Sequence, residues 1–372
     1  MNLTESANCS SEEQLGHADK KGARIEGLDL LKAFAMLFVV TLHVPLWSYD
    51  FSGGVSMGSV LEYAGRLLAE GVPVFVMVNG FLLFGKQKFN FKVHLKKTLH
   101  LFIVFLIWAF IQTLINGYLI GDTMSAGKLV YLVLQTQIGK GYDGVLWFME
   151  NFIALYLIYP LIRLAYDHDR KLFMYIFWLF AFFSVGISTL SLIRDAIAVY
   201  HNTNLLNDGI DFLNRFNPTG NAYFVFCLML GGILHDSQEW LVKHKLELAV
   251  TGLAAWAAIS TTGIWLSVKT GQNYSSGCNY CSISMVIMMI SMTALSLSFR
   301  THHKFTNRLL SCIGKNTMGI YLIHYIMIFA WNRFIGANGN FVHRFLEVII
   351  IYFISLLITV ILRKIPVLKK AF

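Results

Sequence analysis

The sequence predicts an all-α polytopic membrane protein with about ten transmembrane helices, and three observations carry this fold class. Of the 372 residues, 56% are hydrophobic and 14% are charged, whereas charged residues make up about 25% of an ordinary soluble domain. The apolar residues gather in segments that are each close to the roughly twenty residues a helix needs to cross a bilayer. Basic residues concentrate in alternate loops between these segments, as the positive-inside rule requires.

The apolar segments follow a polar stretch, 1–23, which has neither the basic start nor the apolar core of a signal peptide. The first segment is therefore expected to stay in the membrane as an anchor. Gly71 and Pro73 predict a kink or an unwound start in the second segment, and the sixth segment is short. The predicted segments lie at 28–47, 62–84, 97–119, 146–165, 172–193, 220–235, 246–268, 281–299, 315–334 and 343–362.

The loop charges give the orientation. With the N-terminus in the cytoplasm, most of the 30 basic residues fall on that side, including the lysines between 86 and 97. A missed or false segment would reverse every later loop, so the consistent alternation favours ten helices with both termini in the cytoplasm. We expect one transmembrane domain over 24–365, flanked by cytoplasmic tails at 1–23 and 366–372.

The composition also excludes several function classes. A formal net charge of +9 is explained by the loops flanking the membrane, and no basic stretch is interleaved with aromatic residues that would stack bases, so nucleic acid is not expected as a partner. Cys278 and Cys281 form a single CxxC. Without a second pair or nearby histidines, no metal site is predicted, although a local disulfide remains open if this loop faces an oxidising compartment.

The first segment carries the most informative polar residues: Asp29, Lys32 and His43. Lys32 and His43 are almost three helical turns apart, so they share one face and lie roughly 16 Å apart along the axis. Ionisable groups within a bilayer usually face the protein interior and often mark a functional path. His43 suits a general base. Lys32 either snorkels to the interface or binds a phosphate-bearing ligand, and Asp29 is placed to neutralise it.

Other polar residues lie at comparable depths. Glu70 could orient the imidazole of His43, or it is an outer-edge carboxylate that reaches water. Glu150 and Asn151 fall in the outer third of the fourth segment, and Asn79 lies within the second. The Lys86–Lys97 loop is either a topology determinant alone or also a rim that binds anions.

The ninth segment carries His324 near its middle and Tyr321 three residues earlier on the same face. These two are either members of a site or partners in a buried hydrogen bond.

Four stretches in order resemble the acyltransferase-3 family of integral-membrane acyltransferases. RIEGLDLLKAFAMLFVVTLH resembles its first helix, where a basic residue precedes a histidine; here these are Lys32 and His43. GVPVFVMVNGFLL resembles its second helix, with Asn79 where serine is common, and LWFMENFIALYLIYPLI resembles a mid-chain helix. IGKNTMGIYLIH resembles the late helix that ends in Tyr-x-x-His, here Tyr321 and His324.

The resemblance implies transfer of an acyl group, frequently acetyl from acetyl-CoA, to a hydroxyl of a carbohydrate or another envelope acceptor. No permanently bound cofactor is implied. His43 would be the essential histidine and Lys32 its basic partner. The family often has two arginines, three residues apart, at the start of the third helix. Here Lys96, Lys97 and His100 stand at about that place, and lysine binds phosphate without the bidentate fork of arginine.

The sequence therefore predicts an O-acetyltransferase of a bacterial cytoplasmic membrane, whose partners are acyl-CoA, a carbohydrate or lipid-linked glycan, and membrane lipid. Glu150 or Glu70 would orient His43, while Tyr321, His324 or Asn79 would donate a hydrogen bond to the developing oxyanion. Asn79 and Asn151 are the expected acceptor-binding residues. A transporter or flippase for an envelope glycan or polar solute is the rival hypothesis, because it too would contain ten spans and buried polar groups.

Overall fold

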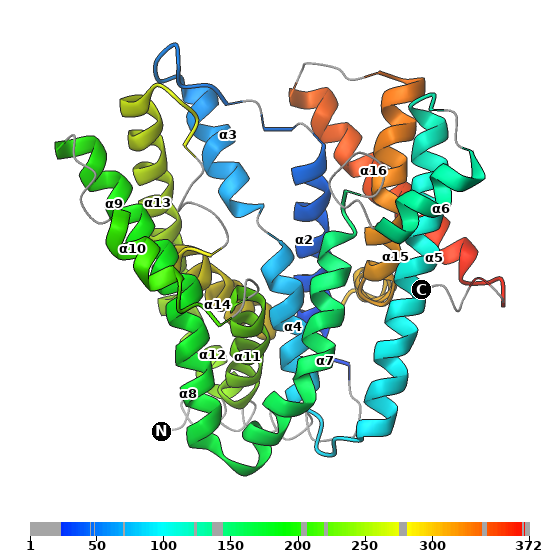
Figure 1. Ribbon diagram of the computed structural model, residues 1–372, viewed down its shortest axis with the longest axis horizontal. Helices are drawn as coiled ribbons and strands as arrows, with labels where there is room; N and C mark the ends of the chain where they lie inside the picture. The colour runs from blue at the N-terminus through cyan, green and yellow to red at the C-terminus, as the bar shows by residue number, and fades with distance from the viewer. Residues whose placement is uncertain are drawn as a thin grey trace, which may run out of the picture.

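The computed structural model describes residues 24–44, 46–47, 49–69, 71–122, 125–135, 144–201, 207–218, 222–274, 281–336, 341–366 and 368. Within these residues every regular element is a helix. Figure 1 shows α9, α10 and α13 on one side of the molecule and α5, α6, α15 and α16 on the other, with α2, α4 and α7 between them. The fold class is therefore confirmed as all-helical.

The helices follow one another along the chain with these bounds: α2 (Glu26–His43), α3 (Met57–Leu68), α4 (Val72–Phe84), α5 (Phe91–Leu119), α6 (Ala126–Gln135), α7 (Trp147–His168), α8 (Arg170–Ala181), the π-helical turn η1 (Phe182–Gly186), α9 (Ile187–His201), α10 (Asn207–Asn214), α11 (Ala222–Asp236), α12 (Gln238–Lys243), α13 (Lys245–Thr270), α14 (Ile283–Leu297), α15 (Lys304–Phe334) and α16 (Phe341–Leu362).

Six helical stretches among the described residues are long and apolar enough to cross a membrane: Met57–Phe84, Phe91–Leu119, Trp147–His168, Arg170–His201, Lys245–Thr270 and Phe341–Leu362. Two shorter apolar helices, α11 and α14, accompany them. The other two predicted segments are also helical, as α2 and α15, but both carry charged residues along their length. The count of ten spans, the orientation of the termini and the domain bounds therefore stay predictions.

The predicted break in the second segment is confirmed. Helix α3 ends at Leu68, and α4 begins at Val72 with Pro73 in its first turn. Proline is tolerated there because the first backbone N–H groups of a helix have no intrahelical acceptor. The break gives α4 a start of its own beside α2.

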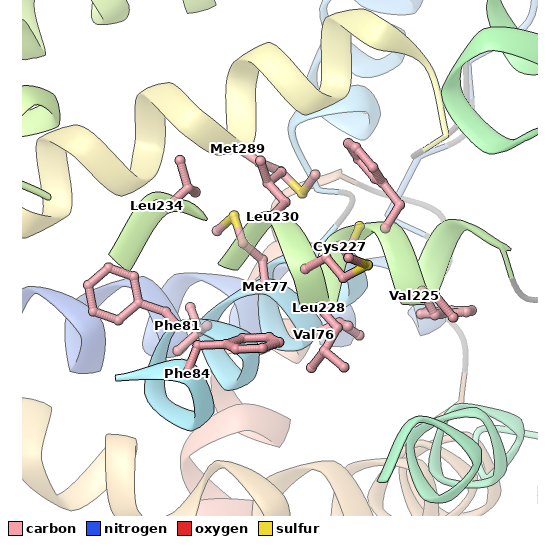
Figure 2. Packing of buried hydrophobic residues seen from close by; sticks show 14 of the residues in the cluster. Val76, Met77, Phe81, Phe84, Val225, Cys227, Leu228, Leu230, Leu234 and Met289 are labelled. Carbon is pink, nitrogen blue, oxygen red and sulfur yellow. The ribbon is translucent and has the colours of Figure 1, made fainter. Parts of the chain in front are cut away.

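The core has two large parts that lie on either side of α2 and α4. One part joins α4, α7, α8, α11 and α14, and Figure 2 shows Met77 and Phe81 of α4 packed with Cys227, Leu228 and Leu230 of α11. The other joins α2, α5, α15 and α16. Residues of α2 belong to both parts, so the two parts meet at this helix. The face of α2 that carries Asp29 and Lys32 lies against α15.

Glycine allows α4 and α11 to approach closely. A Cβ at Gly80 would overlap the carbonyl oxygen of Leu228, and a Cβ at Gly231 would overlap that of Met77. Backbone atoms cannot move aside as the end of a flexible side chain can, so an added methyl group would force the helices apart.

We expect Gly80→Ala to lower the stability of the protein by about 1–3 kcal/mol, the usual range for overpacking a core. Gly58→Ala is the matched control, because a Cβ there meets only the Ser56 hydroxyl at 3.8 Å and alanine favours a helix by roughly 0.5–1 kcal/mol over glycine. Thermal unfolding in detergent measures both. Equal unfolding temperatures for the two variants would contradict the close approach.

Arg163 of α7 holds the C-terminal end of α4. Its side chain, 5% exposed, donates to the carbonyl oxygens of Leu83 at 3.1 Å, Phe84 at 3.2 Å and Lys86 at 2.8 Å. Its Nε also donates to Asp167 at 2.7 Å. The last carbonyl groups of a helix lack intrahelical partners, so Arg163 satisfies the end of α4 and fixes it against α7.

Candidate active site

A buried carboxylate organises the first turns of α2. Asp29, 5% exposed, pairs with Arg24 and with Lys32, whose Nζ lies 2.6 Å from its Oδ1. Lys32 also donates to the carbonyl oxygen of Gly314 on α15 at 3.2 Å. A Cβ at Gly314 would overlap the Asp29 carboxylate, so only glycine leaves room for this group. The expected pairing of Lys32 with Asp29 is confirmed, and because Arg24 shares the same carboxylate the three residues together keep a positive charge.

His43 ends the same helix beside a second histidine. Its ring centre lies 5.4 Å from that of His324 on α15 and 5.8 Å from that of Tyr325. His43 is half-buried, and no described residue forms a hydrogen bond with its imidazole. The two residues are 281 positions apart in the chain, and the parallel packing of α2 on α15 brings them together.

His324 is fully buried and its bonding defines its tautomer. Its Nδ1 lies 2.6 Å from the carbonyl oxygen of Tyr321. A carbonyl oxygen only accepts, so Nδ1 carries the hydrogen and Nε2 of the neutral ring is an acceptor. This Nε2 is buried and has no partner among the described residues. The hydroxyl of Tyr321 donates to the carbonyl oxygen of Val145, so His324 bonds the backbone of Tyr321 rather than its hydroxyl.

A cavity of about 250 Å³ lies between α2, α4, α5, α7 and α15. Lys32 lines it, and Tyr321, whose ring centre is 5.9 Å from that of His324, lines it as well. Most of the remaining wall is apolar. The cavity is lined by Lys32, Phe75, Val78, Asn79, Leu82, Leu101, Phe148, Met149, Phe152, Tyr156, Thr317, Met318 and Tyr321.

Asn79 and Tyr156 are two polar residues that line this cavity. The Tyr156 hydroxyl donates to the Asn79 side-chain oxygen at 3.0 Å. The ring of His94 stacks on that of Tyr156 at 5.2 Å, and its Nε2 bonds the backbone oxygen of Tyr156 at 2.7 Å. Asn79, which was expected at the acceptor, therefore lies in the same cavity as Lys32.

The other expected site residues lie in several places. Glu150 is half-buried at the start of α7 and interacts electrostatically with Tyr321. Asn151 donates to the backbone oxygen of Trp147 in its own helix at 2.9 Å and does not line the cavity. Glu70 lies outside the described residues. Exposed positions near the start of α5 hold Lys96, Lys97 and His100.

Sequence reasoning missed Tyr156 and gave His94 no role. Both were visible in the sequence, as a tyrosine in the fourth segment and a histidine three residues before the start of the third. Residue type alone does not distinguish these two as site residues from the other tyrosines and histidines of the chain. Once Leu101 is known to line the cavity, the seven-residue spacing places His94 on the same face of α5.

No group of three histidine, cysteine or acidic side chains able to hold a metal ion occurs within the described ranges. Cys278 of the CxxC lies outside those ranges, and Cys281 is half-buried near the start of α14.

The cavity has a lysine in its wall and a histidine pair nearby, and three of the helices around it, α4, α5 and α7, belong to stretches long and apolar enough to cross a membrane. These features define an integral membrane protein with a candidate site between its helices. The family model described as an acyltransferase domain matches residues 25–364. The chain belongs to the acyltransferase-3 family. No curated protein and no solved structure matches the chain in the other two comparisons.

Proposed function

We propose that this membrane acyltransferase transfers an acetyl group from acetyl-CoA to a hydroxyl of a cell-envelope glycan in a bacterial cytoplasmic membrane. The observation that carries the proposal is the cavity, which extends from Lys32 to Tyr321 beside the histidine pair. Lys32 offers a positive charge to an anionic donor, and the half-buried His43 offers a base with no hydrogen bond from the described residues. Family membership supports acyl transfer as the reaction class.

The apolar wall suits the pantetheine arm of the donor. Phe75, Val78 and Leu82 lie on one face of α4 and, with Phe152 and Leu101, leave few polar groups to compete with a thioester. Phe75 and Leu82 are seven residues apart, so this face covers roughly 10 Å along the helix axis. The arm would enter beside Lys32 and extend toward Tyr321, with the thioester at the far end.

The reaction itself needs one proton acceptor. His43 takes the hydroxyl proton of the acceptor as its oxygen attacks the thioester carbonyl carbon. The tetrahedral intermediate then collapses, the C–S bond breaks, and the thiolate of CoA takes that proton from His43. Donors to the oxyanion are not provided by Nε2 of His324 or by the hydroxyl of Tyr321, because the first is an acceptor and the second donates to Val145.

Cations gather at the end of α4, where CoA phosphates would bind. Desolvation, followed by the positive charges of Lys97 and Arg163, lowers the pKa of Lys86. Neighbouring cations destabilise the charged form of an ammonium group, and a bound polyanion would remove that repulsion. This arrangement supports the prediction that Lys97, with Lys96 and His100 nearby, contributes to the donor site.

We expect Lys97→Ala to raise the pKa of Lys86, because the substitution removes a neighbouring positive charge. The rate at which an amine-reactive reagent modifies Lys86, followed against pH, reports this pKa. At a fixed pH the rate should fall in Lys97→Ala, and it should fall in the wild type when CoA is added. The control is Lys269→Ala, which replaces an exposed lysine of α13 and should leave the rate of Lys86 modification unchanged. If CoA leaves the rate of Lys86 modification unchanged, these cations at the end of α4 do not belong to the donor site.

We expect Lys32→Met to raise the dissociation constant of acetyl-CoA about 10- to 100-fold, because hydrogen bonds to charged groups contribute about 1.5–3 kcal/mol. Asp29 keeps Arg24 as a partner in this variant, so the helix end stays paired. Isothermal titration in detergent measures the affinity. The control is Lys315→Met, which replaces an exposed lysine on α15 and should bind the donor like the wild type. Equal affinity of all three proteins for acetyl-CoA would exclude Lys32 from the donor site.

Mass spectrometry of envelope glycans from cells with and without the protein tests the whole proposal. A gain of one acetyl unit that depends on the protein supports O-acetylation. A gain of a different acyl mass would show that the donor carries another acyl group. Movement of an unmodified glycan across the membrane would instead support the flippase hypothesis.

A further inference from the structure

The unpartnered nitrogen of His324 points to a role that the proposed reaction leaves unexplained. A buried polar atom without a partner is costly, and native structures contain few of them. His324 is fully buried, and its Nε2 is such an atom among the described residues. The nearest titratable ring is that of His43, whose imidazole also lacks a hydrogen bond from those residues.

The spacing of the two rings fits a hydrogen bond between them. Each imidazole nitrogen lies about 1.1 Å from its ring centre, so an N–H···N bond of about 2.9 Å places the centres about 5 Å apart. The observed separation is 5.4 Å, with 47° between the ring planes. The observed separation is therefore close to that of a direct hydrogen bond between the two rings.

The tautomer of His324 sets the direction of that bond. Its Nδ1 hydrogen is committed to the Tyr321 carbonyl oxygen, so Nε2 can only accept while the ring is neutral. His43 must then donate, which leaves its other nitrogen unprotonated. One bond thus fixes both the tautomer and the orientation of the base.

We infer that His324 is a positioning residue for His43: its Nε2 accepts the N–H of His43 and directs the basic nitrogen of His43 toward the acceptor hydroxyl. When His43 takes the hydroxyl proton it becomes a cation, and a charge-assisted hydrogen bond is roughly twice as strong as a neutral one. The inference rests on the proposed acyl transfer, and it replaces the expectation that His324 donates to the oxyanion.

Two substitutions separate this role from a structural one. In His324→Asn, the amide reaches the position of Nδ1 and keeps the bond to Tyr321, but nothing remains opposite His43. In His324→Gln, the amide reaches the position of Nε2 and its oxygen can accept from His43. A positioning role therefore predicts that glutamine preserves activity better than asparagine, whereas a purely structural role predicts the reverse order.

We expect His324→Asn to lower kcat about 100-fold, the lower end of what a general base contributes, with the KM for acetyl-CoA unchanged. His324→Gln should stay within about tenfold of the wild type. Adding His324→Asn to His43→Ala should change the residual rate no further, because His324 acts through His43. Wild-type kcat in His324→Asn, or an additional loss in the double variant, would overturn the inference.

The controls keep the two proposals apart. If His43→Ala transfers acetyl at the wild-type rate, the proposed function fails in its choice of base. If His43→Ala is inactive and His324→Asn is fully active, only the role of His324 fails. Should His324→Asn not yield folded protein, His324→Gln decides alone: activity near the wild type supports the role, and a loss as large as that of His43→Ala overturns it.

Discussion

Replacing His43 with alanine is expected to lower the rate of acetyl transfer about 1,000-fold, within the range that general base catalysis contributes. Donor affinity should change little, because His43 does not line the cavity that contains Lys32. Purified protein in membranes, radiolabelled acetyl-CoA and a candidate glycan provide the assay. The initial rate gives the catalytic effect, and equilibrium binding of acetyl-CoA is measured separately.

The matched control for this variant is His168→Ala, an exposed histidine at the last position of α7. It should transfer acetyl at the wild-type rate, which would show that the loss of activity is specific to His43 and does not follow from replacing any histidine. A His43→Ala rate equal to that of His168→Ala would mean that another group takes the proton. Loss of donor binding in His43→Ala would instead place His43 in the donor site.

Replacing Arg163 with methionine is expected to lower the stability of the protein by about 3–5 kcal/mol, because backbone carbonyl oxygens lose hydrogen bonds from a charged donor, each of which contributes about 1.5–3 kcal/mol. The substitution keeps much of the side-chain volume. It removes the Arg163 donor from the carbonyl oxygens of Phe84 and Lys86 and one of the donors to that of Leu83, which keeps the Tyr159 hydroxyl, and it leaves Asp167 without its cation. Thermal unfolding in detergent should show a lower midpoint than for the wild type.

Arg170→Met is the comparison, because that arginine pairs with Asp236 at 2.7 Å on an exposed surface. Exposed ion pairs contribute about 1 kcal/mol or less, so its unfolding midpoint should lie close to the wild type. Similar midpoints for the two variants would show that Arg163 does not support the end of α4. Acetyl transfer by any folded Arg163→Met should also fall, since α4 forms one wall of the cavity.

The sequence was sufficient for the fold class and for the break before α4. Apolar length predicts helices that enter a bilayer, and Gly71 with Pro73 marks a place where a helix starts again. The extent of each membrane span is harder to predict. In α2 the polar side chains of Asp29 and Lys32 lie against α15, and hydropathy cannot tell such a helix from one that lies partly outside the membrane.

For the site, the sequence predicted individual residues but not their partners. The helical period placed Lys32 and His43 on one face, because both lie in one continuous helix. The contact of His43 with His324 joins helices far apart in the chain, and it depends on the packing of α2 on α15. Residue type also did not predict the tautomer of His324, which follows from a single backbone contact with Tyr321.

The rings of Tyr321 and Phe148 meet edge to face with their centres 5.6 Å apart, and both line the cavity. His43 lies outside that lining. On the proposed function, a donor loaded in the cavity is separated from the catalytic base by these aromatic side chains. On that proposal, its thioester would reach the base only when the rings move apart. The enzyme would hold an activated acyl group in reserve, and arrival of the acceptor, rather than of the donor, would set when it is released.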